Sequence, residues 1–193
     1  AETARKNSID LPASLIHKVV TAGEPGAAIL STKKAMESQW GARVYDDLGS
    51  TEGGNFGHEC VLQQGTHVIE SMFIAEVLDS ETLQPLEDGR IGELVLTSLC
   101  CESMPLIRYR THDLVRFNRT PCECGRTGLR LDGGVLGRSD DMFHFAGVNI
   151  FPGQIQHLLH EVNEFSQEYQ LVVPALGSGK HLRIRVEPAN EHL

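Results

Sequence analysis

The spacing of apolar residues changes along this chain from a mixed strand and helix pattern to regular alternation. Apolar positions in residues 15–21 predict a short buried strand, followed by a turn at 23–25. From residue 28 to residue 40 apolar side chains recur at helical spacing, and Gly41 is placed to end that helix. A second strand is expected over residues 43–48. This order predicts a parallel strand pair joined by a crossover helix.

Beyond residue 71 the alternation is typical of antiparallel strands. Residues 72–78 and 91–99 predict a hairpin. Residues 106–110 and 114–117 predict a second strand pair around Thr111-His112-Asp113. We therefore expect a small antiparallel sheet or barrel in the middle of the chain.

The segment Gly137–Pro152, GRSDDMFHFAGVNIFP, is predicted to be a hinge between a strand-rich body and a small helix-led unit. A charged hairpin joining two ordinary strands is the alternative interpretation. Pro152 is suited to open a helix, and strands are expected over 169–173 and 182–186. The expected domains are residues 1–138 and a small, mobile α+β unit of residues 139–193.

Composition narrows the possible partners and the compartment. The chain has 193 residues with 40% hydrophobic and 22% charged residues and a formal net charge of -9, so nonspecific binding to nucleic acid is not expected. No polybasic run, signal core or bilayer-length apolar stretch is present in the sequence, so we predict a cytoplasmic protein without membrane contact. The first residue is Ala rather than Met, which suggests a fragment or a processed chain.

The cysteine pattern favours reduced thiols or a metal site over disulfides. There are five cysteines, two of them adjacent at Cys100-Cys101. Four soft ligands fit a structural, tetrahedral zinc ion, namely Cys60, His67, Cys122 and Cys124. The alternatives are a buried free thiol at position 60, an exposed imidazole at position 67, and His58 as a rival ligand.

The loop Gly49–Gly54, GSTEGG, carries chemistry that can hold a nucleotide phosphate. Its small residues surround the hydroxyl of Thr51 and the carboxylate of Glu52, which together can bind a phosphate group and its magnesium ion. By itself such a loop is more often an ordinary turn.

Four segments together resemble the adenylate-forming (acyl-CoA synthetase-like) ligases, and most closely the phenylacetate-CoA ligase family. They are residues 23–25, 46–52, 106–113 (containing IRYRTHD) and 137–152. The resemblance implies a mixed α/β and α+β fold: the C-terminal part of the large adenylating domain in residues 1–138, and the start of the small mobile domain in residues 139–193.

The family activity implied by this resemblance is that of an acid-thiol ligase. Such enzymes activate a carboxylic acid with ATP and magnesium as an acyl adenylate, and then transfer the acyl group to coenzyme A. An aryl acid such as phenylacetate, and a role in phenylacetate catabolism, are expected from the resemblance alone. Some relatives also hold a structural zinc at positions that match the four Cys and His residues.

The resemblance also assigns roles to individual residues. The positions that match the nucleotide site are Glu24, Pro25, Asp46, Gly49, Thr51, Asp113 and Arg138. Glu24 and Pro25 match the turn beside the adenine, and Asp113 matches the ribose ligand.

The positions expected to act in catalysis are Thr51, Glu52 and Asp140. Thr51 and Glu52 match the phosphate and magnesium ligands, and Asp140 matches the residue about which the small domain turns. Arg138 matches a nucleotide contact. The alternatives are an Asx-turn at Asp113, a surface ion pair at Arg138 and a turn cap at Thr51.

Departures from the family pattern lead to further expectations. Leu48 replaces an aromatic residue that would stack on adenine. Asn55 or Phe56 could line the acyl pocket, with a position in the core as the alternative for Phe56. The family's glycine-rich phosphate loop and C-terminal catalytic lysine are not found, and Lys180 is discounted as that lysine because it is expected in a hairpin. The chain is therefore expected to be incomplete, inactive alone, and prone to self-association or to binding a complementing N-terminal polypeptide.

The alternative functions are an adenylyltransferase without CoA transfer and a noncatalytic zinc-stabilised interaction module.

Overall fold

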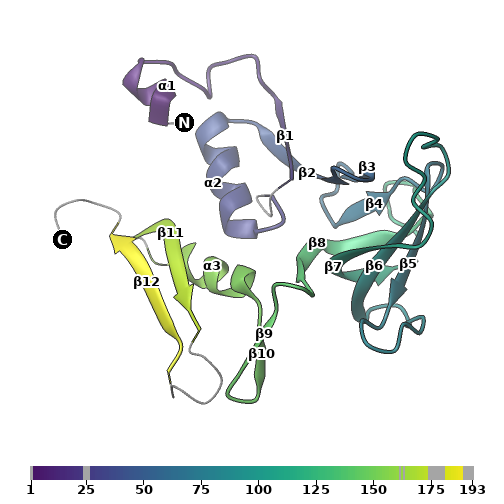
Figure 1. The fold of residues 1–193 in the computed structure, drawn as a ribbon. Coiled ribbons are helices and arrows are strands. Elements are labelled where there is room, and N and C mark those ends of the chain that lie inside the picture. Colours follow the sequence, from purple (N-terminus) through teal and green to yellow (C-terminus); the bar gives the residue numbers. More distant parts are fainter. Residues whose placement is uncertain (1, 24–26, 161, 163, 174–180, 189–193) are drawn as a thin grey trace. The chain divides into compact units, whose positions relative to one another are not determined.

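The chain forms two compact units, Ala1–Ser139 and Asp140–Leu193 (Figure 1). The computed structural model describes residues 2–23, 27–160, 162, 164–173 and 181–188. None of the helices in these residues is long and apolar enough to cross a membrane.

In the first unit, one mixed sheet contains all the described strands. The elements are α1 (Glu2–Lys6), β1 (Lys18–Ala22), α2 (Leu30–Trp40), β2 (Arg43–Ser50), β3 (Gly54–Glu59), β4 (Thr66–Val68), β5 (Phe73–Leu78), β6 (Ile91–Ser98), β7 (Tyr109–Asn118) and β8 (Arg130–Arg138). The strand order is β1-β2-β3-β4-β8-β7-β6-β5. Only β1 and β2 run parallel, and each of the other neighbouring pairs is antiparallel.

The predicted parallel pair with a crossover helix is confirmed. β1 pairs with β2 in parallel, and α2 connects them. Gly41 ends α2 in the left-handed conformation with φ 61°, and its N–H donates to the carbonyl of Glu37. A side chain at position 41 would be strained there and would also approach Pro12 Cα to 2.9 Å, so both the conformation and the space favour glycine.

The expectation of a buried first strand is wrong in its bounds and in its burial. β1 begins at Lys18, and Leu15, which was expected inside it, is 91% exposed. Val20 within β1 is 59% exposed. β1 is the first strand in the sheet order, so it has a neighbouring strand on one side, and its apolar side chains are incompletely covered.

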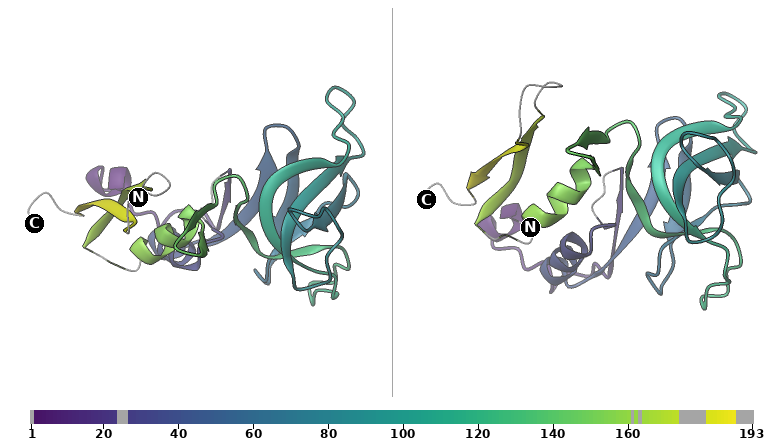
Figure 2. Two further views of the ribbon diagram at one scale, coloured as in Figure 1. Left: turned by 60° about the horizontal axis from the view of Figure 1, so that its bottom comes forward. Right: turned by 90° about the horizontal axis from the view of Figure 1, so that it is seen from below.

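The antiparallel region predicted in the middle of the chain is present, and it is continuous with the parallel pair. β2 turns directly into β3, and β3, β4 and β8 connect that end of the sheet to β5, β6 and β7. Figure 2 shows the antiparallel strands, in teal and green, curling into a strongly curved sheet. The alternation of residues did not reveal β3 or β8, because glycines interrupt both strands, at Gly54 and Gly57 in β3 and at Gly133 and Gly134 in β8.

The strand pair predicted around residues 111–113 is wrong, because β7 is one continuous strand. Glu93 of β6 pairs with Leu114 and Val95 pairs with Arg110, so three residues of β7 lie opposite one residue of β6. The extra residues form a bulge rather than a turn.

The core of the first unit is formed mainly by buried side chains of the curved sheet. Its buried members are Leu48, Phe56, Val68, Phe73, Val77, Leu94, Leu96, Val115, Phe117, Leu129 and Leu131. Phe56 and Phe73 meet edge to face with ring centroids 6.4 Å apart. Because β6 is buried over five successive residues, both of its faces are covered by other parts of the unit.

In the second unit, a hairpin precedes a helix and a strand pair. β9 (Phe143–Phe145) and β10 (Val148–Ile150) are antiparallel, with Ala146 and Gly147 at φ 50° and 85° between them. The segment expected to be a hinge therefore includes the hairpin that was the alternative interpretation. α3 (Pro152–His160) opens at Pro152 as predicted, and β11 (Phe165–Val172) pairs with β12 (Arg183–Pro188).

Candidate functional site

Asp113 and Arg138, which the family resemblance assigned to the nucleotide, form a pair in the structure. They are direct partners across β7 and β8, and Arg138 Nη1 lies 3.4 Å from Asp113 Oδ1. The same Nη1 donates to the carbonyl oxygen of Thr111 at 3.3 Å. The Asp113 side chain is 16% exposed and that of Arg138 is 44% exposed, so both reach the surface. A carboxylate beside a guanidinium can accept hydrogen bonds from hydroxyls while the guanidinium binds an anion.

A buried carboxylate anchors β7 beside this pair. Glu93 on β6 is 1% exposed, and it accepts a hydrogen bond from Arg110 Nε at 2.9 Å. The second Glu93 oxygen accepts from Arg110 Nη2, which makes the pair bidentate. Hydrogen bonding from Arg110 lowers the pKa of Glu93, which keeps it ionised despite its burial.

Asp46 lies buried on β2, close to the backbone of β8. It is 4% exposed, and a side chain at Gly134 would approach its Oδ2 to 3.1 Å. Glu59 Oε2 accepts from the Asp46 backbone N–H at 3.0 Å and from Lys33 Nζ at 2.6 Å. Burial, together with the charge of Glu59, raises the pKa of Asp46 to about 6, and Lys33 partly offsets this. The Asp46 carboxylate therefore lies in a buried, negatively charged environment, and its predicted role at the nucleotide stays a prediction.

Replacing Asp46 by Asn is expected to stabilise the protein at neutral and alkaline pH. The folded pKa is about 6 and the ordinary value is 3.8, so ionisation opposes folding as pH rises through this window. The variant should gain about 3 kcal/mol above pH 7 and roughly half of that at pH 5. Urea unfolding at both pH values measures this. A gain that is the same at pH 5 and pH 8 would contradict the assignment. The control is Asp47→Asn, at the neighbouring carboxylate, which is only half-buried and accepts a hydrogen bond from Asn55 Nδ2 at 2.9 Å.

Thr51 and Glu52 lie exposed on the turn between β2 and β3. The Ser50 hydroxyl caps this turn by accepting from the Gly53 N–H at 2.9 Å, a role that the sequence had offered to Thr51 as an alternative. A side chain at Gly49 would come within 2.9 Å of the Gly54 carbonyl oxygen. Gly49 is therefore required by the tight approach of the two strands, and the hydroxyl and carboxylate of the turn remain accessible.

The other positions predicted from the sequence lie outside the described residues, at the surface or in the core. Glu24, Pro25 and Lys180 lie outside the described residues. Asp140 is exposed at the start of the second unit. Leu48 and Phe56 are both buried core residues, so the core position that was the alternative for Phe56 is confirmed.

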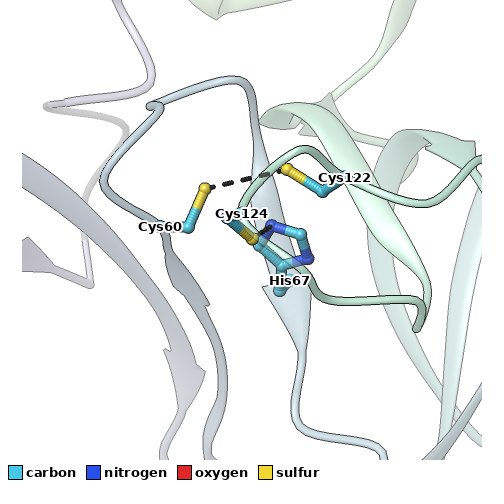
Figure 3. Close-up of side chains that lie close together, drawn as sticks. All are labelled: Cys60, His67, Cys122 and Cys124. Atoms are coloured by element: carbon cyan, nitrogen blue, oxygen red, sulfur yellow. Dashed lines mark hydrogen bonds between the residues drawn. The ribbon is translucent and has the colours of Figure 1, made fainter.

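Cys60, His67, Cys122 and Cys124 come together from distant parts of the sequence (Figure 3). Cys60 follows β3, His67 lies on β4, and the other two cysteines lie in the loop between β7 and β8. Their ligand atoms all lie within 4.8 Å of one another. The Cys60 and Cys122 sulfurs are 4.0 Å apart, and Cys124 Sγ is 3.7 Å from His67 Nε2. Three thiols and one imidazole in such proximity form a closed set of soft donors.

The surroundings of this cluster favour a thiolate at Cys124 and oppose one at Cys60. The Arg126 backbone N–H and guanidinium lower the pKa of the Cys124 thiol to about 7, whereas burial raises that of Cys60. Burial and nearby arginines lower the pKa of His67, which keeps the imidazole neutral. His58 Nε2 instead contacts Arg126 Nη2 at 3.2 Å and does not belong to the four-residue cluster.

Reasoning from the sequence missed the buried charges that support the site. Lys33, Glu59 and Glu93 were not singled out, although all are buried or nearly so. One signal was available: Lys33 lies four residues after Ile29 and three before Met36, on the apolar face of the predicted helix. A lysine on such a face indicates a buried partner.

Comparison with known proteins relates both units to one family. The model of the AMP-binding enzyme C-terminal domain matches residues 147–193. The phenylacetate-coenzyme A ligase of Thermus thermophilus is 36% identical over 190 residues, which is 97% of this chain and 42% of that protein. The enzyme of the same name from Escherichia coli is 36% identical over 158 residues, or 80% of this chain and 35% of that protein.

Solved structures agree with these relatives. A 2-hydroxyisobutyryl-CoA ligase in the postadenylation state superposes with a TM-score of 0.88 at 30% identity, covering 97% of this chain and 40% of that one. An anthranilate CoA ligase has the same fold, with a TM-score of 0.65 at 18% identity over 92% of this chain and 35% of that one. The fold described above is therefore part of the adenylate-forming ligase fold. The chain spans 42% of the length of the Thermus thermophilus relative and 40% of the length of the 2-hydroxyisobutyryl-CoA ligase.

Proposed function

The chain belongs to the phenylacetate-CoA ligase family of adenylate-forming enzymes, and we propose that it provides nucleotide-binding residues to an AMP-forming acid-CoA ligase. The proposed acid is an aryl carboxylic acid such as phenylacetate. One observation carries this proposal. Asp113 and Arg138, which match the family's nucleotide contacts, are paired across β7 and β8 with both side chains reaching the surface.

The proposed chemistry uses this chain's residues to hold the nucleotide in place. Asp113 accepts hydrogen bonds from the ribose hydroxyls, and Arg138 binds the charged part of the nucleotide. The Thr51 hydroxyl donates to phosphate oxygens as the acid's carboxylate attacks the α-phosphorus and pyrophosphate leaves. The thiol of coenzyme A then displaces AMP from the acyl adenylate, and Asp140 is the proposed pivot between these two steps.

Magnesium is proposed to bind at the same turn. Glu52 is an exposed carboxylate on a turn of small residues, which fits an ion that keeps several waters and takes few protein ligands. When bound, magnesium would neutralise charge on the phosphates. Glu52 would then orient the nucleotide as well as hold the metal.

Removing either member of the proposed pair is expected to weaken ATP binding. Arg138→Ala and Asp113→Ala should each raise the Kd for ATP about tenfold, because each removes a charge-assisted hydrogen bond. Isothermal titration calorimetry measures the effect. Arg119→Ala is the matched control, since Arg119 also lies in an exposed ion pair, with Nη1 3.1 Å from Asp88 Oδ1. If Arg138→Ala binds ATP as tightly as the unmodified chain, the proposed site is wrong.

A structural zinc ion is proposed for the four-residue cluster. In a tetrahedral site with Zn–S bonds of about 2.3 Å, sulfur atoms lie about 3.8 Å apart. The Cys60 and Cys122 sulfurs are 4.0 Å apart, close to that value. Nε2 of His67 lies 3.7 Å from Cys124 Sγ and is therefore the proposed ligand atom. Nδ1 of His67 is buried without a hydrogen-bond partner among the described residues. All four positions would be filled by protein, so the ion would tie the β3–β4 and β7–β8 loops together rather than activate water.

Location and assembly are also proposals. A cluster of reduced thiols fits the cytoplasm, and fractionation of source cells tests this.

The free edge of β1 and the exposed apolar side chains of Leu15, Val20 and Leu30 favour self-association of the isolated chain. Light scattering over a wide concentration range should show mass increasing with concentration. A monomer throughout, or a complex with a different polypeptide, would contradict self-association.

A further inference from the structure

The bulge in β7 holds a backbone conformation that its sequence does not favour. His112 has φ 63°, in the left-handed region that suits glycine and is uncommon for other residues. Within the bulge the Thr111 hydroxyl donates to the carbonyl of Leu94 at 3.0 Å and accepts from the Asp113 N–H at 3.1 Å. Such a conformation persists only where surrounding contacts hold it in place.

The contacts of His112 come from both sides of the bulge. Its Nδ1 lies 3.3 Å from Oε1 of the buried Glu93 and 3.4 Å from the hydroxyl of Ser139. Its carbonyl oxygen accepts from the Ser139 N–H at 2.7 Å. Glu93 also accepts a hydrogen bond from Arg110, so one buried carboxylate contacts β7 both before the bulge and within it. His112 thereby connects this buried anchor to the end of β8.

Both members of the proposed nucleotide-binding pair lie next to these contacts. Asp113 directly follows His112, and Arg138 directly precedes Ser139. We propose that His112 is a positioning residue, which holds the Asp113 carboxylate and the Arg138 guanidinium in the geometry that accepts a ribose. This inference rests on the proposed nucleotide-binding function, and His112 acts only through its two neighbours.

The test compares ATP with 2′-deoxy-ATP, because discrimination between them reports the geometry of Asp113 toward the ribose hydroxyls. The unmodified chain is expected to bind ATP about tenfold more tightly than 2′-deoxy-ATP. His112→Gly accepts the same φ but lacks the imidazole. It should bind ATP about tenfold more weakly and lose most of the discrimination. His112→Asn, which tolerates the left-handed conformation and keeps a polar side chain, should recover part of both.

The outcomes separate this inference from the function on which it rests. If the unmodified chain binds neither nucleotide, the proposed function fails. If it discriminates and His112→Gly keeps its affinity, or loses affinity with the ratio unchanged, only the positioning role is overturned. Leu83→Gly is the control, because Leu83 has φ 58° in the β5–β6 connection and its replacement relieves similar strain elsewhere. Melting curves of each variant establish that it is folded, and the Asn variant provides the measurement if the Gly variant does not fold.

Discussion

Replacing Cys122 and Cys124 together by serine is expected to remove about one zinc ion per chain and to lower the melting temperature by about 10 °C or more. Metal binding is coupled to folding, because the unfolded chain has no preformed site and the free energy of binding adds to that of folding. Cys60 and Cys122 are 62 positions apart in sequence, so the ion would close a long loop in addition to filling the cluster. Elemental analysis of protein purified without chelator measures the metal, and calorimetry measures the melting temperature.

The matched control for this experiment is Cys100→Ser with Cys101→Ser. These two cysteines undergo the same chemical change and do not belong to the four-residue cluster. The control should keep both its zinc and its melting temperature. Zinc content well below one ion per chain in the unmodified protein would refute the metal site. So would a Cys122 and Cys124 double variant that keeps its metal and its stability.

Replacing Lys33 by Met is expected to destabilise the first unit by about 3–5 kcal/mol. Lys33 and Glu59 are only 9% and 8% exposed, and their charged atoms are 2.6 Å apart. Without the ammonium group, the carboxylate of Glu59 would stay buried beside that of Asp46 with no cation to compensate either charge. Urea unfolding of zinc-saturated protein at pH 7 gives the loss directly.

Two further variants make this experiment decisive. Lys34→Met changes the exposed neighbour on the same helix and should alter stability by less than about 0.5 kcal/mol. Lys33→Met combined with Glu59→Gln removes both charges and should recover part of the loss, because no uncompensated ion remains. A loss below about 1 kcal/mol for Lys33→Met alone would show that the pair contributes little to stability.

The elements that the sequence predicted well are those whose signals are local. Gly41 marks the end of α2 because the left-handed cap is a property of that one residue. Pro152 opens α3 for a similarly local reason, its fixed φ. The alternation in β5 and β6 survives in the structure because one hairpin pairs neighbouring strands and needs no distant partner. The ordered motifs around residues 107–113 and 137–152 were also sufficient to identify the family.

Periodicity and ordered motifs were therefore enough to predict the type of each strongly periodic element, the family, and the four Cys and His residues, with His58 left as a rival ligand. Which strands pair and which charges are buried depends on contacts between distant parts of the chain. The strand pattern is interrupted at residues 111–113, and the sequence there is compatible with either a turn or a bulge. The structure shows a bulge, because β7 pairs with β6 on one side and with β8 on the other. Lys33 meets Glu59 26 residues away because β3 lies beside β2, an arrangement set by sheet register. Periodicity predicts which face of an element is buried. The residues that this face contacts depend on the free energy of packing of the whole sheet.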